Sequence, residues 1–248
     1  MKPFGVMADL HCHAWSAFAG TDEEGRNTRL MEILHEIDRC CEAVGQAGGE
    51  LVVIAGDVFH VRGRVAPSVF NPVKQCLQRH VAGGMRFDIL PGNHDLEGKD
   101  ARELTSAVAM LEAPGIRVLH RPFVEGDFAY VPWRTKRAEL LDDIAWCAKA
   151  GAGDLDLFIH AGIDGVLDGV PAHGLTAEQL ADFGFRRVWA GDYHNARMMA
   201  NGKVISVGAP VHHTWSDVGV RAGWWVVDDI GPRWFASHAP RFIDITGD

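Results

Sequence analysis

Five short apolar segments of the chain each end at a residue that can bind a metal ion. The segments are Phe4–Ala8, Leu51–Ala55, Arg86–Leu90, Leu155–Ile159 and Arg187–Ala190. Their apolar and β-branched residues predict buried strands, and the amphipathic stretches between them predict helices, an alternation typical of an α/β protein. In open α/β sheets, ligands bind at the carboxyl ends of the strands. We therefore expect the residues that follow the five segments to meet in one cleft.

Other segments complete the α/β pattern. Helices are expected over Arg29–Val44, Pro67–Val81, Ala101–Glu112, Lys136–Ala150 and Thr176–Ala181. Further strands are expected at Ile116–Leu119, Phe128–Val131, Gly223–Val227 and Trp234–Ser237. Asn201-Gly202 predicts a β-hairpin within Met198–Val207, because this dipeptide suits a tight hairpin turn. Nothing in the pattern indicates a domain boundary.

The residues after the five strands offer carboxylate, carboxamide and imidazole donors. They are Asp9 and His11, then Asp57, Asn93 and His160, and finally Asp192 and His194. One Asp, Asn or His after a strand is most often turn chemistry, but five ordered coincidences favour a site. A donor set without thiolate suits Mn²⁺, Fe²⁺ or Zn²⁺. Seven donors are too many for one ion and suit two that share a bridging ligand, for which Asp57 is the candidate.

The order of these blocks resembles the calcineurin-like metallophosphoesterase superfamily. The blocks are Asp-x-His at Asp9, Gly-Asp at Gly56, Gly-Asn-His-Asp at Gly92, a lone His160 and Gly-x-x-His ending at His194. The resemblance implies an α/β four-layer sandwich, with two mixed β-sheets flanked by helices. It implies a single domain over residues 1–248 without a capping domain, and two divalent ions, Mn²⁺ before Fe²⁺ or Zn²⁺.

The resemblance also implies a ligand set for each ion. One ion would be held by Asp9, His11, Asp57 and His194, and the other by Asp57, Asn93, His160 and Asp192. Asp192 stands where the family usually has a histidine, within Gly191-Asp192-Tyr193-His194. A carboxylate can bind the same ions and gives the site a harder character. The alternative is that Asp192 only orients Tyr193 and His194.

A finer resemblance concerns the segment Gly56-Asp57-Val58-Phe59-His60, followed by Pro67-Ser68, and the turn Gly208-Ala209-Pro210. These segments resemble the SbcD-type DNA repair nucleases. The resemblance implies DNA as substrate, a role for His60 in placing or protonating the DNA strand, and an SbcC-like ATPase and a second copy of the chain as partners. His60 as a plain turn residue is the alternative. SbcD-type enzymes continue into a capping domain and an ATPase-binding segment; here we expect either that these parts are absent or that the partner is engaged differently.

The expected mechanism is attack on phosphorus by a hydroxide that bridges two ions. His94 is expected to protonate the leaving oxygen. Asp95 is expected to orient His94 through a hydrogen bond, with a purely structural Asp95 as the alternative. Arg62 and Arg64 follow the second block and are expected to contact substrate.

Several aromatic, basic and histidine side chains are secondary candidates for substrate contact. A second basic cluster combines Arg134, Lys136 and Arg137 with Trp133. Trp15 and Phe18 are expected either to wall the cleft or to lie under it, and His212 and His213 to face the site. Solvated surface charges are the alternative for the basic residues.

Composition limits the alternatives. The formal net charge of −9 argues against a protein that coats nucleic acid by bulk electrostatics. Five cysteines without a CxxC pair are typical of reduced thiols in a cytoplasmic protein. No apolar run approaches the roughly 20 residues of a membrane span, and the amino-terminal segment lacks the features of a signal peptide.

Three functions remain. The leading hypothesis is a metal-dependent phosphodiesterase that hydrolyses DNA as an exonuclease or endonuclease. The first alternative, favoured by the acidic charge, is a small-molecule or nucleotide phosphoesterase of the same superfamily. The second is a non-catalytic scaffold of this fold, which the retained donor set disfavours.

Overall fold

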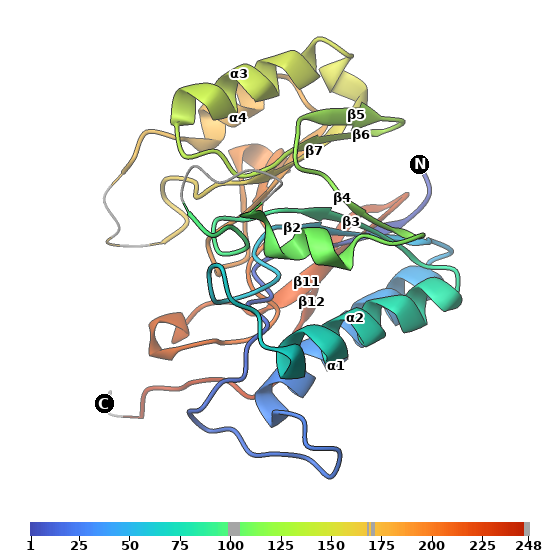
Figure 1. Ribbon diagram of the computed structural model, residues 1–248. Coiled ribbons are helices and arrows are strands. Elements are labelled where there is room, and N and C mark those ends of the chain that lie inside the picture. Colours follow the sequence, from blue (N-terminus) through green and yellow to red (C-terminus); the bar gives the residue numbers. More distant parts are fainter. Residues whose placement is uncertain (99–104, 168, 170–171, 246–248) are drawn as a thin grey trace.

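Two six-stranded sheets lie face to face in the middle of the molecule, and helices cover both outer faces (Figure 1). The computed structural model describes residues 1–98, 105–167, 169 and 172–245. The first sheet has the order β12-β11-β1-β2-β3-β4 and the second the order β5-β6-β7-β8-β10-β9. This arrangement confirms the expected four-layer α/β sandwich.

The described elements have the following bounds. The first sheet contains β1 Phe4–Met7, β2 Leu51–Ala55, β3 Arg86–Leu90, β4 Ile116–Val118, β11 Gly223–Asp228 and β12 Gly231–Ala236. The second contains β5 Phe123–Glu125, β6 Phe128–Val131, β7 Asp156–His160, β8 Arg187–Gly191, β9 Arg197–Met199 and β10 Val204–Ser206. The α-helices are α1 Thr28–Gln46, α2 Pro67–Ala82, α3 Arg137–Ala148 and α4 Ala177–Asp182.

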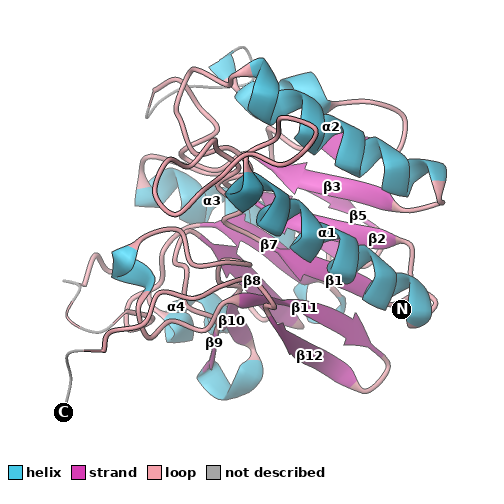
Figure 2. Cartoon of the chain, turned by 90° about the horizontal axis from the view of Figure 1, so that it is seen from below, coloured by secondary structure: helices cyan, strands magenta, loops and turns pink. Residues whose placement is uncertain are grey.

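Both sheets are mixed. Strands β1 to β4 pair in parallel, and β11 and β12 add antiparallel partners at the β1 side. In the second sheet β6, β7, β8 and β10 are parallel, while β5 and β9 are antiparallel edge strands. The loops after the parallel strands gather on one side of the molecule (Figure 2). This geometry brings the residues that follow β1, β2, β3, β7 and β8 near one another.

Three layers of apolar side chains hold the sheets and helices together. The buried face of α1, with Ile33 and Ile37, packs with α2 on the first sheet, and α3 and α4 pack on the second. Aromatic residues fill the space between the sheets. The Phe158 ring stacks on Trp189 with centroids 6.4 Å apart, and Phe4 meets Trp189 edge-on. Such pairs add about 0.5–1.5 kcal/mol each beyond their burial, so this layer fixes how the sheets face each other.

Two details differ from the sequence-based expectation. Of the helix expected over Ala101–Glu112, residues 101–104 lie outside the described part, and the rest forms a 3₁₀ helix over Ala107–Leu111. Ser106 instead forms a β-bridge with Leu96, and Pro114-Gly115 leaves no room for further turns. The short strand β5 was not expected. The hairpin at Asn201 is confirmed, with Asn201 in the left-handed region at φ 54°.

Within the described residues, the helices are too short or too polar to cross a lipid bilayer.

Candidate metal centre

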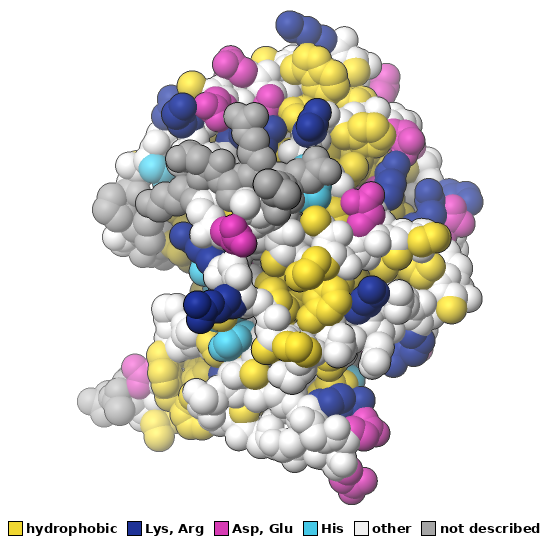
Figure 3. Space-filling model, in the orientation of Figure 1, with side chains coloured by type: hydrophobic (Ala, Val, Ile, Leu, Met, Phe, Trp, Pro, Cys, Tyr) yellow, Lys and Arg dark blue, Asp and Glu magenta, His cyan; other side chains and the backbone are white. Residues whose placement is uncertain are grey.

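The structure brings the seven predicted donors to one place between the ends of the two sheets. From the first sheet come Asp9 and His11 after β1, Asp57 after β2 and Asn93 after β3; from the second come His160 at the end of β7, and Asp192 and His194 after β8. The space-filling view shows a hollow on one side of the molecule, with His and Lys or Arg side chains at its rim (Figure 3).

Four of the donors have a left-handed backbone. The φ angles are 53° at Asp9, 44° at His11, 53° at Asp57 and 101° at Asp192. Residues other than glycine rarely adopt this conformation. It lets the Asp9 N–H donate to the Gly56 carbonyl at 3.0 Å, and the His11 N–H to the Asp57 carbonyl at 2.9 Å. Strain of about 1–3 kcal/mol per residue of this kind gathers at functional sites.

Two glycines make the close approach possible. A Cβ on Gly92 would lie 2.1 Å from Oδ1 of Asp57, and a Cβ on Gly56 would lie 2.0 Å from Nδ1 of His160. Gly56 also has φ 96°, which disfavours other residues. Any side chain at either position would push a candidate donor out of place.

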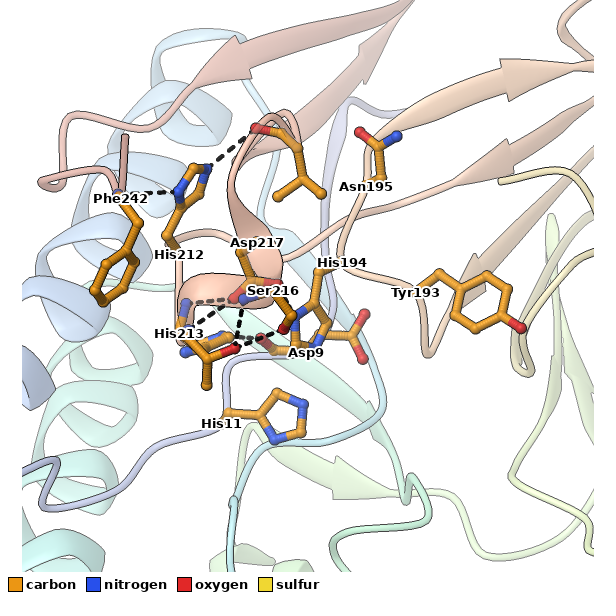
Figure 4. Close-up of polar contacts among 12 residues, drawn as sticks. Asp9, His11, Tyr193, His194, Asn195, His212, His213, Ser216, Asp217 and Phe242 are labelled. Atoms are coloured by element: carbon orange, nitrogen blue, oxygen red, sulfur yellow. Dashed lines mark hydrogen bonds and ion pairs between the residues drawn. The ribbon is translucent and has the colours of Figure 1, made fainter. Parts of the chain in front are cut away.

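Asp9, His11 and His194 form the first group of donors. One ligand atom from each residue lies within 4.8 Å of the others. The Nδ1–H of His194 donates to Oδ1 of Asp217 at 2.8 Å, which leaves Nε2 with a free lone pair (Figure 4). A carboxylate in this position fixes the tautomer and orientation of a metal-binding histidine. His194 is thus held ready to bind an ion through Nε2.

Asp57, His160 and Asn93 form the second group. The Nδ1–H of His160 donates to the Ala55 carbonyl at 2.7 Å, so its Nε2 faces the site. That Nε2 lies 3.5 Å from Asp57 Oδ1 and 3.1 Å from the Asn93 carboxamide oxygen. The other Asp57 oxygen, Oδ2, lies 3.6 Å from His11 Nε2. The Asp57 carboxylate therefore lies between the two groups, with Oδ1 beside His160 and Oδ2 near His11, as a ligand shared by two ions would.

The donor chemistry fits divalent cations. Ligand atoms held about 2.0–2.2 Å from one ion lie about 3–3.5 Å apart, which matches the separations in the second group. The Asn93 carboxamide oxygen also lies 3.1 Å from Asp57 Oδ2, so once Nε2 of His160 has lost its proton, as binding of an ion requires, this oxygen faces acceptor atoms of both Asp57 and His160. An oxygen among acceptors has no hydrogen to bind and is suited to a cation. Turning the amide over would make it donate to the same atoms instead.

Asp192 also lies in the second group. Its Oδ1 is 3.8 Å from Nε2 of His160, and its backbone N–H donates to both Asp9 oxygens at 3.1 Å. Tyr193 points away from His194 and Asp9 (Figure 4). The Asp192 carboxylate thus lies where the resemblance expects a donor atom.

Burial and neighbouring charges shift the pKa values of these groups strongly. Burial raises the pKa of Asp9 to about 7. Burial, reinforced by neighbouring histidines, lowers the pKa of His11 well below its usual value. Burial alone would lower the pKa of His160, but the charges of Asp57 and Asp9 raise it well above the usual value. The carboxylates around His160 thus attract positive charge to this place in the structure.

His94 lies at the edge of the two groups. Its Nδ1–H donates to the His60 carbonyl at 2.7 Å, and its ring centroid is 4.8 Å from that of His11. The backbone N–H of His94 donates to Asp57 Oδ1 at 2.8 Å. Within the part of the chain that the structure describes, Nε2 of His94 has no hydrogen-bond partner and can exchange a proton with a bound molecule.

The expected hydrogen bond from Asp95 to His94 is wrong. The Asp95 oxygens instead accept backbone N–H groups of Val58, Phe59 and Gly92 at 2.9–3.2 Å. The carbonyl of His60 orients His94 in its place. Asp95 joins the loops after β2 and β3, because its side chain is fully buried between them, and burial raises its pKa to about 7.

The family is decided by sequence comparison. A profile of the calcineurin-like phosphoesterases matches residues 2–196. This chain belongs to the calcineurin-like phosphoesterase family. Members of the family use two divalent metal ions, so it is a metal-dependent phosphoesterase by membership. Among curated proteins, exonuclease subunit 1 of Enterobacteria phage T4 is 25% identical over 183 residues, which are 70% of this chain and 51% of the relative. The chain thus spans about half the length of this relative.

A solved structure of a dimetal phosphatase supports the fold of this phosphoesterase. A dimetal phosphatase from Danio rerio has a TM-score of 0.51 and 10% identity, covering 90% of this chain and 91% of its own. The Pseudomonas putida nuclease MPE has a TM-score of 0.40 and 17% identity, covering 93% of this chain and 86% of its own.

The structure separates the predicted substrate contacts of the phosphoesterase. A terminal nitrogen of Arg62 lies 3.2 Å from the Asn93 carboxamide, at the rim of the site. Arg64 lines a different pocket with Cys12 and Val69. His60 is placed inside the site, with Nδ1 3.3 Å from Nδ1 of His11. Arg62 and His60 are thus close enough to meet a ligand.

The second basic cluster is tied to its own surroundings. Arg134 pairs with Asp143 at 2.7 Å, and Lys136 pairs with Glu139 at 3.2 Å. Arg137 donates to the Gly174 carbonyl at 2.8 Å. The Trp133 ring reaches the site, with its centroid 6.1 Å from that of His160.

Sequence reasoning missed two residues of the site and placed a third correctly. Asp217 and Arg29 were not expected. Asp217 could have been found, since Thr214-x-x-Asp217 is a capping-box pattern and the structure forms that box at Trp215–Asp217. His213 faces the site as expected, and its Nε2–H donates to the Asp9 carbonyl at 2.9 Å. His212 points away, towards Val220 and Phe242 (Figure 4).

Proposed function

We propose that this chain is a phosphodiesterase that hydrolyses DNA with two Mn²⁺ ions, as an exonuclease or endonuclease of SbcD-like type. The observation that carries the proposal is the position of His94. Its Nδ1–H is fixed on the His60 carbonyl at 2.7 Å, and its backbone N–H is fixed on Asp57 at 2.8 Å. A potential proton donor is thereby held beside a double set of metal donors.

The two groups of donors define the proposed ligand sets. Asp9, His11, Asp57 and His194 would hold one ion, and Asp57, Asn93, His160 and Asp192 the other. When bound, the ions supply an activated water as nucleophile and neutralise charge on the phosphate. Three carboxylates and one carboxamide oxygen beside three imidazoles favour Mn²⁺ over softer ions.

The chain's own residues complete the proposed reaction. Protonated at Nε2, His94 gives its proton to the leaving oxygen, while Nδ1–H keeps the ring in place. Arg62, at the rim, binds a non-bridging phosphate oxygen, since its guanidinium is exposed. His60 supports His94 from behind, with the two rings stacked at 5.6 Å.

DNA as substrate has separate support. The curated relative is named as a subunit of an exonuclease. The segment from Gly56 to His60 resembles SbcD-type nucleases, and the structure places its His60 next to His11 and His94. The relative's description as a subunit supports a partner protein, for which the proposal names an SbcC-like ATPase, and the proposal keeps a homodimer as the second expected assembly. Five free, buried cysteines support a reducing, cytoplasmic location.

Hydrolysis assays test the proposal. The protein is stripped with chelator, reloaded with Mn²⁺ and offered labelled single- and double-stranded DNA beside bis-p-nitrophenyl phosphate. We expect DNA cleavage that His94→Ala reduces by about 10²–10⁴-fold, with Mn²⁺ affinity unchanged. We also expect DNA binding to weaken steeply as the salt concentration rises, because the protein binds several phosphates.

Three results would contradict the proposal. Cleavage of the small diester with DNA left intact would make the chain a small-substrate phosphoesterase. Absence of any hydrolysis by the Mn²⁺-loaded protein would favour a scaffold. DNA cleavage by His94→Ala at the rate of the unmodified chain would show that His94 does not donate the proton or that the cleavage comes from a contaminating nuclease, and either explanation would remove the support for this proposal.

A further inference from the structure

An aromatic patch lies beside the candidate metal centre. Phe18 and Trp215 have 75% and 60% of their surfaces exposed. Their ring centroids lie 6.2 Å apart, and both rings contact Phe242, at 5.7 and 4.8 Å. We call Phe18, Trp215 and Phe242 the aromatic patch. Such a cluster, with two rings largely exposed and one partly exposed, is uncommon, because exposed large apolar side chains are usually scattered singly over the surface.

The three rings of the patch line a pocket of about 340 Å³. Trp15 also lines this pocket. Its ring stacks on His213 at 5.7 Å and contacts His60 at 4.5 Å, and both histidines touch His11. The guanidinium of Arg29, 4.8 Å from the Trp15 ring and 5.5 Å from the Phe242 ring, links this row of rings to the patch. The surface view shows hydrophobic side chains close to the hollow, towards the carboxyl end of the chain (Figure 3).

Charged residues and one residue with a strained backbone line the pocket. The guanidinium of Arg29 lies 4.8 Å above the Trp15 ring and donates to the carbonyls of His212 and His213 at 3.2 and 2.8 Å. Phe18 has φ 56°, which is costly for a bulky residue. Two arginines, Arg29 and Arg241, face one carboxylate, Glu32, so the charge in the pocket favours an anion.

We propose that the aromatic patch stacks an unpaired nucleobase of the DNA strand whose phosphodiester lies at the metal centre. The inference rests on the proposed function. Flat exposed rings next to positive charge are how proteins bind single-stranded nucleic acid. A base inside a duplex has no free face to offer, so the patch selects substrates that are single-stranded or frayed beside the scissile bond.

The geometry also couples the patch to the centre. Trp215 belongs to the short 3₁₀ helix that ends at Asp217, and Asp217 holds His194. Phe18 lies in the loop between the donors after β1 and helix α1. A base stacked on Trp215 is thus held by the same segment that orients a metal donor, which fixes the distance between base and scissile phosphate.

Binding assays with the full chain test the inference. His94→Ala is used as the background so that DNA stays intact, and fluorescence polarisation measures Kd for a labelled single-stranded oligonucleotide with Mn²⁺ present. We expect Trp215→Ala to weaken binding about tenfold or more, as for the loss of one stacked base, and Trp215→Phe to restore most of it. Phe18→Ala should act in the same direction. Trp146→Ala, which removes a 53% exposed tryptophan from α3, should have no effect.

An oligonucleotide with abasic sites distinguishes stacking from other contacts. The abasic oligonucleotide should bind weakly to the parent His94→Ala protein, in which Trp215 is intact. The additional substitution Trp215→Ala should weaken this binding no further. A Mn²⁺ titration of Trp215→Ala that matches the parent shows that the metal centre is intact.

The outcomes separate the two proposals. Equal DNA binding by Trp215→Ala and its parent, or equal losses for normal and abasic DNA, would overturn the inference while DNA cleavage by the unmodified chain upholds the proposed function. Such a result would favour an apolar protein partner, in place of DNA, as the ligand of the aromatic patch. Failure of the unmodified chain to cleave DNA would overturn the proposed function itself.

Discussion

The Nδ1–H of His194 donates to Oδ1 of Asp217 at 2.8 Å, while the other Asp217 oxygen accepts the backbone N–H groups of His213 and Thr214 at 2.7 and 2.9 Å. One carboxylate thus caps a short helix and orients a metal donor at once. The charge of His194 and these hydrogen bonds outweigh the effect of burial and lower the pKa of Asp217 to about 2.

Asp217→Asn tests this relationship. The single oxygen of Asn would stay on the backbone N–H groups, and its NH₂ would face His194 and favour the tautomer with the proton on Nε2. We expect Mn²⁺ affinity to fall by about 10–100-fold, measured by calorimetric titration. Asp228→Asn, which alters a carboxylate paired with Arg233 at 2.8 Å, is the matched control. Equal affinities in both variants would contradict the assignment.

Metal binding should stabilise the fold measurably. Mn²⁺ at about a thousandfold above its Kd adds roughly 4 kcal/mol, which raises Tm by about 8–16 °C for a chain of this size. Differential scanning calorimetry of the chelator-treated protein, with and without Mn²⁺, measures the shift. Asp57→Asn should lose most of it, because Asp57 faces both donor groups. A full shift in that variant would show that Mn²⁺ binds elsewhere.

Gly92→Ala should damage the site through geometry alone. The new Cβ would lie 2.1 Å from Asp57 Oδ1, so Asp57 or the loop after β3 must move. We expect Mn²⁺ affinity to fall at least tenfold, about 1.4 kcal/mol, since a bridging donor is displaced. At Gly153 an added Cβ meets nothing within 4 Å, so Gly153→Ala should bind Mn²⁺ normally. Unchanged affinity in Gly92→Ala would show that Asp57 does not contribute.

A hydrogen bond between the two sheets gives a prediction about the stability of the fold that does not depend on metal binding. The buried hydroxyl of Tyr130, in β6, donates to Oδ2 of Asp88, in β3, at 2.7 Å. Tyr130→Phe should lower the free energy of unfolding by about 1–2 kcal/mol, because the carboxylate loses one partner. Urea denaturation measures the change, with Tyr193→Phe as the control. A loss of under half a kcal/mol would mean that Arg117 alone satisfies Asp88.

The fold and the donor groups were largely predictable because their signal is local. Each strand shows in its apolar residues, and each donor lies at or shortly after the end of a strand. Parallel topology gathers the donors of each sheet at one end, and the face-to-face packing of the two sheets then brings Asp57 and His160 together. Asp217 lies 23 residues after His194, and its role depends on a fold-level contact that its own segment only hints at. Asp95 was misassigned for the opposite reason. It is next to His94 in sequence, but its side chain turns to the backbone of the neighbouring loop.

The split of donors between the sheets has a consequence for unfolding. Asp9, His11, Asp57 and Asn93 belong to one sheet, while His160, Asp192 and His194 belong to the other. Ions held by both sets tie together chain segments that lie 67 residues apart at Asn93 and His160 and 183 residues apart at Asp9 and Asp192, as a disulfide would, but through bonds that a chelator releases. The two sheets can then separate only if the bonds between the ions and the donors break. The metal-loaded protein should therefore unfold in one cooperative step, and the metal-free protein should unfold less cooperatively.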